Sequence, residues 1–254
     1  MEFQEHLEAL RREGELLAAA AARGGPDAYV PTCPEWAVRD LVHHTGGVHR
    51  WAAAYVLEQR TEAMDEAQER EVFGPMPDDA DLLPWFREGL ERVLGALRGA
   101  APDLDCWYFL ASPSPRQFWA RHQAHETAIH RVDAEAAAGD GLSPVPADFG
   151  ADGVDELVSC FHTRPFSRLR ADGPRLLHLR ATDAGDTAAD WYVHLSLDAP
   201  TVERDSEQTP DCTVSGPAEA LYLTLWNRSL PDLLEVEGDA SLLELWRERS
   251  AITW

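Results

Sequence analysis

The chain of 254 residues contains 44% hydrophobic and 26% charged residues, a composition typical of globular proteins rather than of disordered, collagen-like or membrane proteins. Its 45 acidic residues against 22 basic ones, with no lysine, give a formal net charge of −23 at pH 7. So acidic a chain lacks the basic surface that nucleic-acid binding needs and would be repelled by anionic membranes, so we expect neither partner.

The sequence carries no sign of secretion or of membrane insertion. No N-terminal stretch combines basic residues, an apolar core and a small-residue cleavage site, and no apolar run approaches the roughly 18 residues of a spanning helix. The four cysteines are scattered without a C-x-x-C pair, which is typical of reduced thiols. We therefore expect a cytoplasmic protein. Arginine used without lysine suggests a GC-rich genome.

Four long helices are expected in the first part of the chain, from the spacing of apolar residues and the residues that flank them. They cover about 3–22, 34–58, 81–99 and 116–138. Thr32 is expected to cap the second helix, and residues 61–80 are expected to form a loop. The pair Gly46-Gly47 weakens the second helix but allows close approach of another helix or a ligand. This pattern predicts an antiparallel bundle with room for a ligand between facing helices.

The pattern changes after residue 145. A connecting helix is expected over 146–161, then strands over 175–180, 190–197 and 211–215, with helices over 217–227 and 240–249. The fold class is therefore mainly α followed by α+β. We predict two domains: a four-helix bundle over 1–145 and a small α+β domain over 146–254.

Histidines are concentrated on the second and fourth expected helices, which hold six of the ten. On the fourth helix, Glu126 and His130 are four residues apart and about 40° apart around the helix, so both can bind one metal ion. His125 diverges from His130 by about 140°, whereas His122 stays a possible additional ligand. The spacing differs from the H-E-x-x-H motif of zinc proteases.

A catalytic metal site needs at least one more protein ligand and an open position, and the second helix can supply that ligand. His44 lies three residues after Leu41 and four before Val48, on the face expected to be buried, whereas His43 points elsewhere. His49 is less favoured but remains open. Two histidines and one carboxylate suit zinc, nickel and other first-row divalent ions. A lone Glu/His pair is, however, more often a simple hydrogen-bonded pair than a set of ligands.

Other conspicuous residues have simpler expected roles. Trp36 is expected to anchor a core or an interface, and Cys33 to be a buried structural thiol. Asp133 could orient His130 or could pair at the surface. Glu135 is expected on a solvated face.

Two segments match motifs that contain these candidates. Residues 32–44 read TCPEWAVRDLVHH, and residues 125–135 read HETAIHRVDAE. The first resembles the Cys-Pro-x-Trp-x-Val-x-Asp-Leu run, and the second the Glu-x-x-x-His and Asp-Ala segment, of the mycothiol-dependent maleylpyruvate isomerase family. The resemblance implies a DinB-like four-helix bundle that binds a divalent metal, zinc in that family. It implies His44, Glu126 and His130 as the metal ligands.

Three later segments resemble the C-terminal domain of the same family, which is similar to sterol-carrier-type domains. They are TVSGPAEAL at 213–221, LWNR at 225–228 and VEGD at 236–239. In this family the thiolate of mycothiol adds to an activated alkene and is expelled after bond rotation, and the same addition without expulsion is S-transfer. The resemblance thus implies an isomerase or S-transferase with mycothiol as thiol cosubstrate and a small electrophilic substrate, such as a maleyl compound. Arg228 would bind a substrate carboxylate, or would simply be a solvated arginine at a helix end.

Two other functions remain open from the sequence. The same metal could activate water in a thiol-independent hydrolase, because related bundles support several chemistries. Alternatively, the chain could be a non-catalytic protein that binds a small apolar ligand in its C-terminal domain. Activity without a thiol would indicate the first, and a co-purified ligand without turnover the second. Both a monomer and a homodimer are compatible with the sequence.

Overall fold

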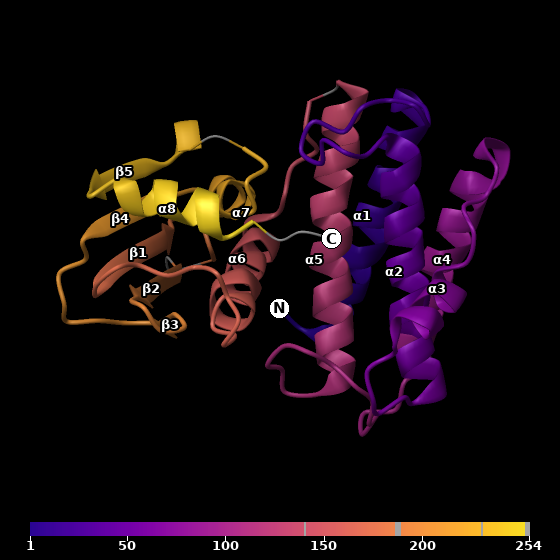
Figure 1. Cartoon of the computed structure of the whole chain (residues 1–254), viewed down its shortest axis with the longest axis horizontal. Helices are drawn as coiled ribbons and strands as arrows, with labels where there is room; N and C mark the ends of the chain where they lie inside the picture. The colour runs from indigo at the N-terminus through magenta and orange to yellow at the C-terminus, as the bar shows by residue number, and fades with distance from the viewer. Residues whose placement is uncertain (140, 186–188, 230, 252–254) are drawn as a thin grey trace. The chain divides into compact units, whose positions relative to one another are not determined.

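The computed structural model describes residues 1–139, 141–185, 189–229 and 231–251 (Figure 1). The chain divides into two compact units, 1–143 and 144–254, so the division falls two residues before the expected one. Among the described residues, no helix is both long enough and apolar enough to cross a membrane. The expected order of a helical bundle followed by an α+β unit is confirmed.

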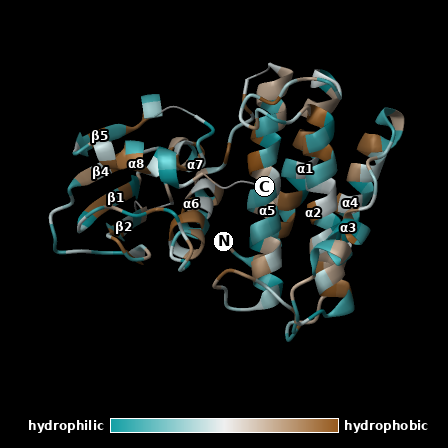
Figure 2. Ribbon diagram, viewed as in Figure 1, coloured by the Kyte–Doolittle hydropathy of each residue, from teal (hydrophilic) through white to brown (hydrophobic). Residues whose placement is uncertain are grey.

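The first unit contains five helices within its described residues. These are α1 (Phe3–Gly24), α2 (Val38–Glu58), α3 (Glu66–Phe73), α4 (Asp79–Gly99) and α5 (Pro115–Ala138). Brown and teal stretches alternate along the long helices in Figure 2, as amphipathic helices require. One apolar core cluster joins four of these helices through Leu17, Leu41, Phe86 and Ala134, all fully buried.

The directions of the helices differ from a simple antiparallel bundle. Helices α1 and α5 run in the same direction, because the Phe3 ring lies 3.8 Å from the Arg116 guanidinium near their starts, and Gly24 packs on Ala138 at their ends. Helices α2 and α4 also run in the same direction, whereas α2 is antiparallel to α5, since His44 lies by His130 and Trp51 by Trp119 (Figure 1). The antiparallel arrangement therefore holds between the two pairs, and the segment between the end of α2 and the start of α4 returns along the bundle.

Helix α2 begins at Val38, later than the expected residue 34. Its first turn is capped by Asp40, whose carboxylate accepts a hydrogen bond from the backbone N–H of Ala37 (2.9 Å). Thr32 was expected to cap this helix, and that prediction is wrong. The Thr32 hydroxyl instead donates to Oδ1 of Asp133 on α5 (2.5 Å). The Thr32 side chain thus bonds to a residue 101 positions away instead of to the first turn of α2.

Helix α3 lies inside the segment 61–80, which was expected to be a loop. The Asp65 carboxylate accepts hydrogen bonds from the backbone N–H groups of Ala67 and Gln68, and the Gln68 side chain accepts one from the backbone of Asp65. This reciprocal cap lets eight residues form a helix although none of them is buried. This helix was not predicted because its stabilising interactions are local caps and its acidic sequence has no apolar periodicity.

The close approach expected at the glycine pair of α2 is confirmed. A Cβ on Gly46 would lie 2.4 Å from the Trp85 ring of α4, and a Cβ on Gly47 would lie 2.3 Å from the Phe73 ring of α3. Both distances are far shorter than van der Waals contact. The missing side chains therefore let two aromatic rings pack directly on α2.

A buried ion network links α1 and α5. Nε of Arg131 donates to Oε2 of Glu13 (2.8 Å), and Nη1 of Arg131 donates to Oε2 of Glu135 (2.7 Å) and to the Ser143 carbonyl (2.8 Å). The expectation that Glu135 lies on a solvated face is wrong, because Glu135 is 1% exposed. Its charge is accommodated inside the bundle by the Arg131 guanidinium, one helical turn earlier on α5.

The second unit is a five-stranded sheet with helices in the order β3-β2-β1-β4-β5. Strands β1 and β4 are parallel, and the other neighbours are antiparallel. The elements are α6 (Ala147–Asp155), the π-helical turn η1 (Glu156–Phe161), β1 (Arg175–Ala181), β2 (Ala189–Leu195), β3 (Thr201–Glu203), β4 (Cys212–Gly216), α7 (Ala218–Leu225), the short 3₁₀ turn η2 (Pro231–Leu233), β5 (Glu235–Gly238) and α8 (Ser241–Arg249). Strands β3 and β5 were not predicted, because β3 has three residues and β5 is exposed throughout.

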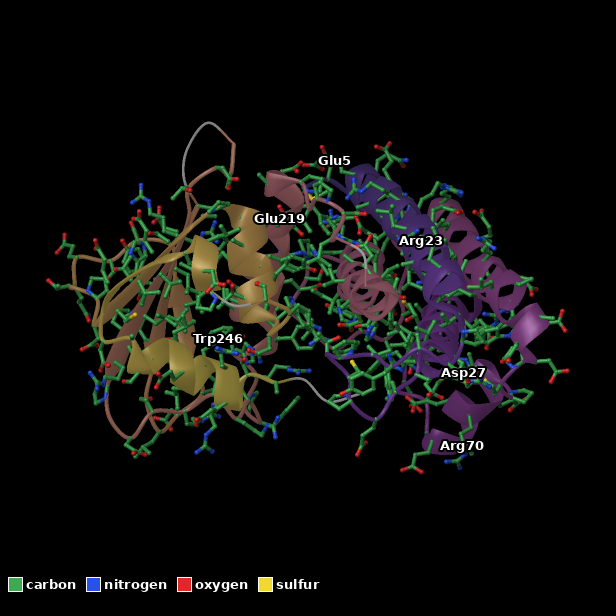
Figure 3. All side chains as sticks on the ribbon, turned by 90° about the horizontal axis from the view of Figure 1, so that it is seen from above. Glu5, Arg23, Asp27, Arg70, Glu219 and Trp246 are labelled. Atoms are coloured by element: carbon green, nitrogen blue, oxygen red, sulfur yellow. The ribbon has the colours of Figure 1, made fainter. Side chains whose placement is uncertain are left out.

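The sheet of the second unit has one apolar face. Side chains that alternate along the central strands are buried there: Leu177, Leu179, Trp191, Val193 and Val214. The Trp191 indole N–H donates to Oδ1 of Asp155 (3.0 Å), which ties the end of α6 to the sheet. On the last helix, the indole N–H of Trp246 donates to the Leu225 carbonyl of α7 (2.9 Å), and Figure 3 marks Trp246 on α8.

Candidate metal centre

Side chains from α2 and α5 converge inside the first unit. One ligand atom from each of His44, Glu126 and His130 lies within 4.8 Å of the other two. The Nε2 atoms of His44 and His130 each lie 3.3 Å from Oε1 of Glu126. Two residues four positions apart share one face of α5, and His44 meets them from the facing helix. The structure therefore brings together the three side chains expected at the site.

The site is buried on one side and bounded by aromatic rings on the other. Glu126 and His130 are 2% and 0% exposed, whereas His44 is partly exposed. The Trp36 ring lies 4.9 Å from the His44 ring and 5.9 Å from that of His130, and Phe73 lies 6.5 Å from His44, measured between centroids. Sequence reasoning missed both aromatics. Trp36 could have been found from its place in the 32–44 motif.

Each of the three side chains has a shifted pKa. Burial opposes the charge of Glu126, but His130 and His44 outweigh it and hold the pKa of Glu126 well below its usual range. Burial also opposes a proton on His130, yet Glu126 and Asp133 raise its pKa to about 9. At His44 burial dominates and lowers the pKa. At pH 7 the protein alone therefore holds an anionic Glu126, a protonated His130 and a neutral His44.

Asp133 orients His130. The fully buried Asp133 accepts a hydrogen bond at Oδ2 from Nδ1 of His130 (2.9 Å). The Thr32 hydroxyl donates to its other oxygen (2.5 Å), and the Cys33 thiol donates to Oδ2 (3.7 Å). With Nδ1 engaged in this way, Nε2 is the nitrogen that faces Glu126. Of the two roles expected for Asp133, the structure shows the orienting one, which is common beside metal-binding histidines.

The donor set fits a divalent ion. Two imidazoles and one carboxylate are ligands that zinc and other first-row ions accept, and three protein ligands leave a position for a further one. Oε2 of Glu126 is buried and accepts no hydrogen bond in the part of the chain that the structure describes. The oxygens of buried carboxylates rarely lack a partner, and a bound cation would provide one for this oxygen.

The other candidate histidines lie outside this group. His43 stacks on the Trp85 ring (5.1 Å between centroids) and donates from Nε2 to a backbone carbonyl. Nε2 of the buried His49 lies 2.9 Å from the Thr127 hydroxyl. His122 packs against aromatic rings at its end of the bundle. The face argument that preferred His44 over its neighbours on α2 therefore agrees with the geometry.

Arg228 lies just after α7 in the second unit and is partly buried. Its Nη1 donates to the Trp226 carbonyl (3.0 Å), and its backbone N–H donates to the Leu223 carbonyl (2.8 Å). The Arg228 side chain is thus held by its own helix end. Its role toward a substrate stays a prediction.

Asp133→Asn is expected to weaken binding of a divalent ion about 10- to 100-fold, because an amide holds the His130 imidazole less firmly and makes it a weaker ligand. Competition with a chelating dye measures this affinity. Thr32→Val is the matched control, since it removes only one of the hydrogen bonds to Asp133 and should have a smaller effect. Unchanged affinity in Asp133→Asn would contradict the orienting role.

The comparisons with known proteins agree with this architecture. The model of the mycothiol maleylpyruvate isomerase N-terminal domain matches residues 7–135, and that of the MDMPI C-terminal domain matches residues 148–245. Two crystal structures, of a mycothiol-dependent maleylpyruvate isomerase and of one of its mutants, are each 14% identical in sequence to this chain. Each alignment covers 93% of this chain and 93% of the other, and the TM-scores are 0.63 and 0.64. This likeness shows a shared fold. None of the curated proteins matches the chain. Because the two family models together span both units, the chain belongs to the mycothiol maleylpyruvate isomerase family.

Proposed function

We propose that the protein is a metal-dependent enzyme that uses mycothiol to isomerise a small electrophilic substrate, such as a maleyl compound. The observation that carries this proposal is the convergence of His44, Glu126 and His130 within a member of this family. These three residues would hold the metal, for which zinc is our first choice. A metal ion bound there would lower the pKa of a thiol ligand and so supply a thiolate at neutral pH.

The residues around the three ligands prepare the site for this chemistry. Asp133 keeps the Nδ1 proton of His130 engaged, so that Nε2 is the nitrogen available to the metal. The raised pKa of His130 means that this nitrogen must lose a proton before it can act as a ligand. Metal affinity should therefore fall as the pH drops below about 9.

Trp36 and Phe73 give the accessible side of the site an apolar boundary beside His44. An apolar wall excludes water and suits the carbon skeleton of an unsaturated substrate. Mycothiol would supply the thiol that adds to the activated double bond and leaves again after rotation about the resulting single bond. We include Arg228 in the proposal as the candidate for a substrate carboxylate, because a guanidinium matches that group.

The test is turnover of maleylpyruvate by zinc-loaded protein, followed by absorbance, with and without mycothiol. We expect isomerisation only when both zinc and mycothiol are present. Accumulation of a stable mycothiol conjugate instead of the isomer would indicate an S-transferase. Turnover of a small metabolite without any thiol would indicate the hydrolase alternative. A ligand that co-purifies with an inactive protein would indicate a non-catalytic binding role.

A further inference from the structure

The formally charged side chains that line one pocket of the second unit are all basic. It has a volume of about 240 Å³ and lies between the segment that follows η1 and the end of α8. Arg164, Arg168 and Arg249 line it, and no aspartate or glutamate does. In the residues that the structure describes, none of these arginines pairs with a carboxylate: Arg168 donates to the Ala251 carbonyl and Arg164 to the Phe161 carbonyl. In a chain with 45 acidic residues and 22 basic ones, three arginines around one pocket without a carboxylate favour an anionic ligand.

Two buried polar atoms belong to residues of the same pocket. Nε2 of His162 and Oγ of Ser250 have no hydrogen-bond partner within the described parts of the chain. The two residues are 6% and 5% exposed. Buried polar atoms nearly always have a partner, so these two atoms offer unused hydrogen-bonding capacity beside the pocket. Water could satisfy these atoms, but it would leave the arginines without a counter-charge.

The hydrogen bonds around His162 allow its Nε2 to act as a donor. Oγ of Ser167 accepts a hydrogen bond from the backbone of Leu169 (3.3 Å), so its own proton can go to Nδ1 of His162 (3.5 Å). Burial, with a contribution from Arg164, lowers the pKa of His162 to about 4. The imidazole is therefore neutral at pH 7, and a proton on Nε2 is compatible with these contacts. The polar groups of the pocket thus offer donors and positive charge.

Aromatic rings form the apolar part of the pocket. The Arg164 guanidinium lies 4.7 Å from the Phe161 ring and 4.6 Å from the Phe166 ring. Phe166 is 71% exposed, which is unusual for so large an apolar side chain. The fully buried Trp246 ring, on α8 in Figure 3, does not line the pocket but packs behind it, 4.9 Å from the ring of His162. A ligand here would meet a flat, apolar surface as well as guanidinium groups.

We propose that this pocket binds a small organic anion, a carboxylate carried on a planar apolar body. The carboxylate would accept hydrogen bonds from Arg168, Arg249 and Ser250, and the planar body would lie against Phe166 and the Arg164 guanidinium. The pocket shares no residue with the metal centre, so this proposal stands or falls separately from the proposed enzyme activity.

The experiment is a titration of the metal-free full chain with 4-fluorobenzoate, followed by fluorine NMR. Removing the metal prevents the probe from binding to a metal ion. We expect saturable binding that Arg249→Gln weakens about tenfold, because one charge-assisted contact is lost. Arg247→Gln is the matched control: Arg247 is also an exposed arginine of α8 but does not line the pocket, and binding should stay unchanged. Ser250→Ala, which changes little volume, should also weaken binding.

Two further probes test the chemistry of the ligand. The neutral 4-fluorobenzamide should bind at least tenfold more weakly than 4-fluorobenzoate, and inorganic phosphate should displace the benzoate only at much higher concentration. Equal binding of the amide, or equal binding by the Arg249→Gln and Arg247→Gln variants, would overturn the anion site. Phosphate that binds as tightly as the benzoate would overturn the proposal that the pocket recognises a planar apolar body.

Discussion

Replacing Glu126 with glutamine is expected to lower the affinity for a divalent ion at least 100-fold and to abolish mycothiol-dependent turnover. Glu126 is the anionic member of the group, and its Oε1 lies 3.3 Å from Nε2 of both His44 and His130. Glutamine keeps the shape of the side chain, but a neutral amide is a poor metal ligand and gives no charge to balance the cation. Elemental mass spectrometry of untagged, dialysed protein measures the metal content. We expect about one divalent ion per wild-type chain and almost none in Glu126→Gln.

Adjacent histidines on α2 provide the matched control. His44→Ala should also lose the ion, whereas His43→Ala should keep it, because His43 stacks on Trp85 and faces away from the group. Both substitutions remove the same side chain from the same helix, so a general loss of helix stability would affect them alike. A wild-type protein that binds no divalent ion, or equal metal content in the two alanine variants, would contradict the metal centre.

The candidate site was largely predictable because its geometry is local. Glu126 and His130 share a face of one helix, which follows from 3.6 residues per turn, and the buried face of α2 selects His44 from its neighbours. The wall of the site was not predictable in the same way. Phe73 lies near His44 because α3 forms and because the Phe73 ring packs on Gly47. The periodicity of apolar residues in the sequence predicts neither the helix nor the contact.

Two errors in the fold concern polar side chains whose partners the apolar periodicity does not show. Thr32 is a good helix cap by residue type, but its hydroxyl is engaged by Asp133, so α2 begins later. Glu135 was placed on a solvated face because it is charged, although Arg131 holds it inside the bundle. The partner of Thr32 lies 101 residues away. Glu135 is held by a residue of its own helix, but Arg131 is buried there because it also pairs with Glu13 of α1, 118 residues away.

Arg131→Met is expected to destabilise the first unit by about 3–5 kcal/mol, the usual cost of removing one partner from a buried ion network. Arg131 is fully buried, as is Glu13, and Glu135 is 1% exposed. Methionine fills much of the volume, but it leaves two carboxylates inside the bundle without their shared cation. Urea unfolding followed by tryptophan fluorescence measures the free energy of unfolding. Arg12→Met is the matched control, because Arg12 pairs with the same Glu13 from the half-exposed side and should cost less than about 1 kcal/mol.

A triple variant separates charge from packing in this network. Adding Glu13→Gln and Glu135→Gln to Arg131→Met removes both buried charges while keeping the side-chain shapes. If uncompensated charge causes the loss, the triple variant should recover a large part of the free energy of unfolding, although each added substitution taken alone removes a hydrogen-bonded carboxylate. A triple variant no more stable than Arg131→Met would assign the loss to packing. Because His130 precedes Arg131 on α5, metal content measured in the same variants shows whether the network also holds the metal ligands in place.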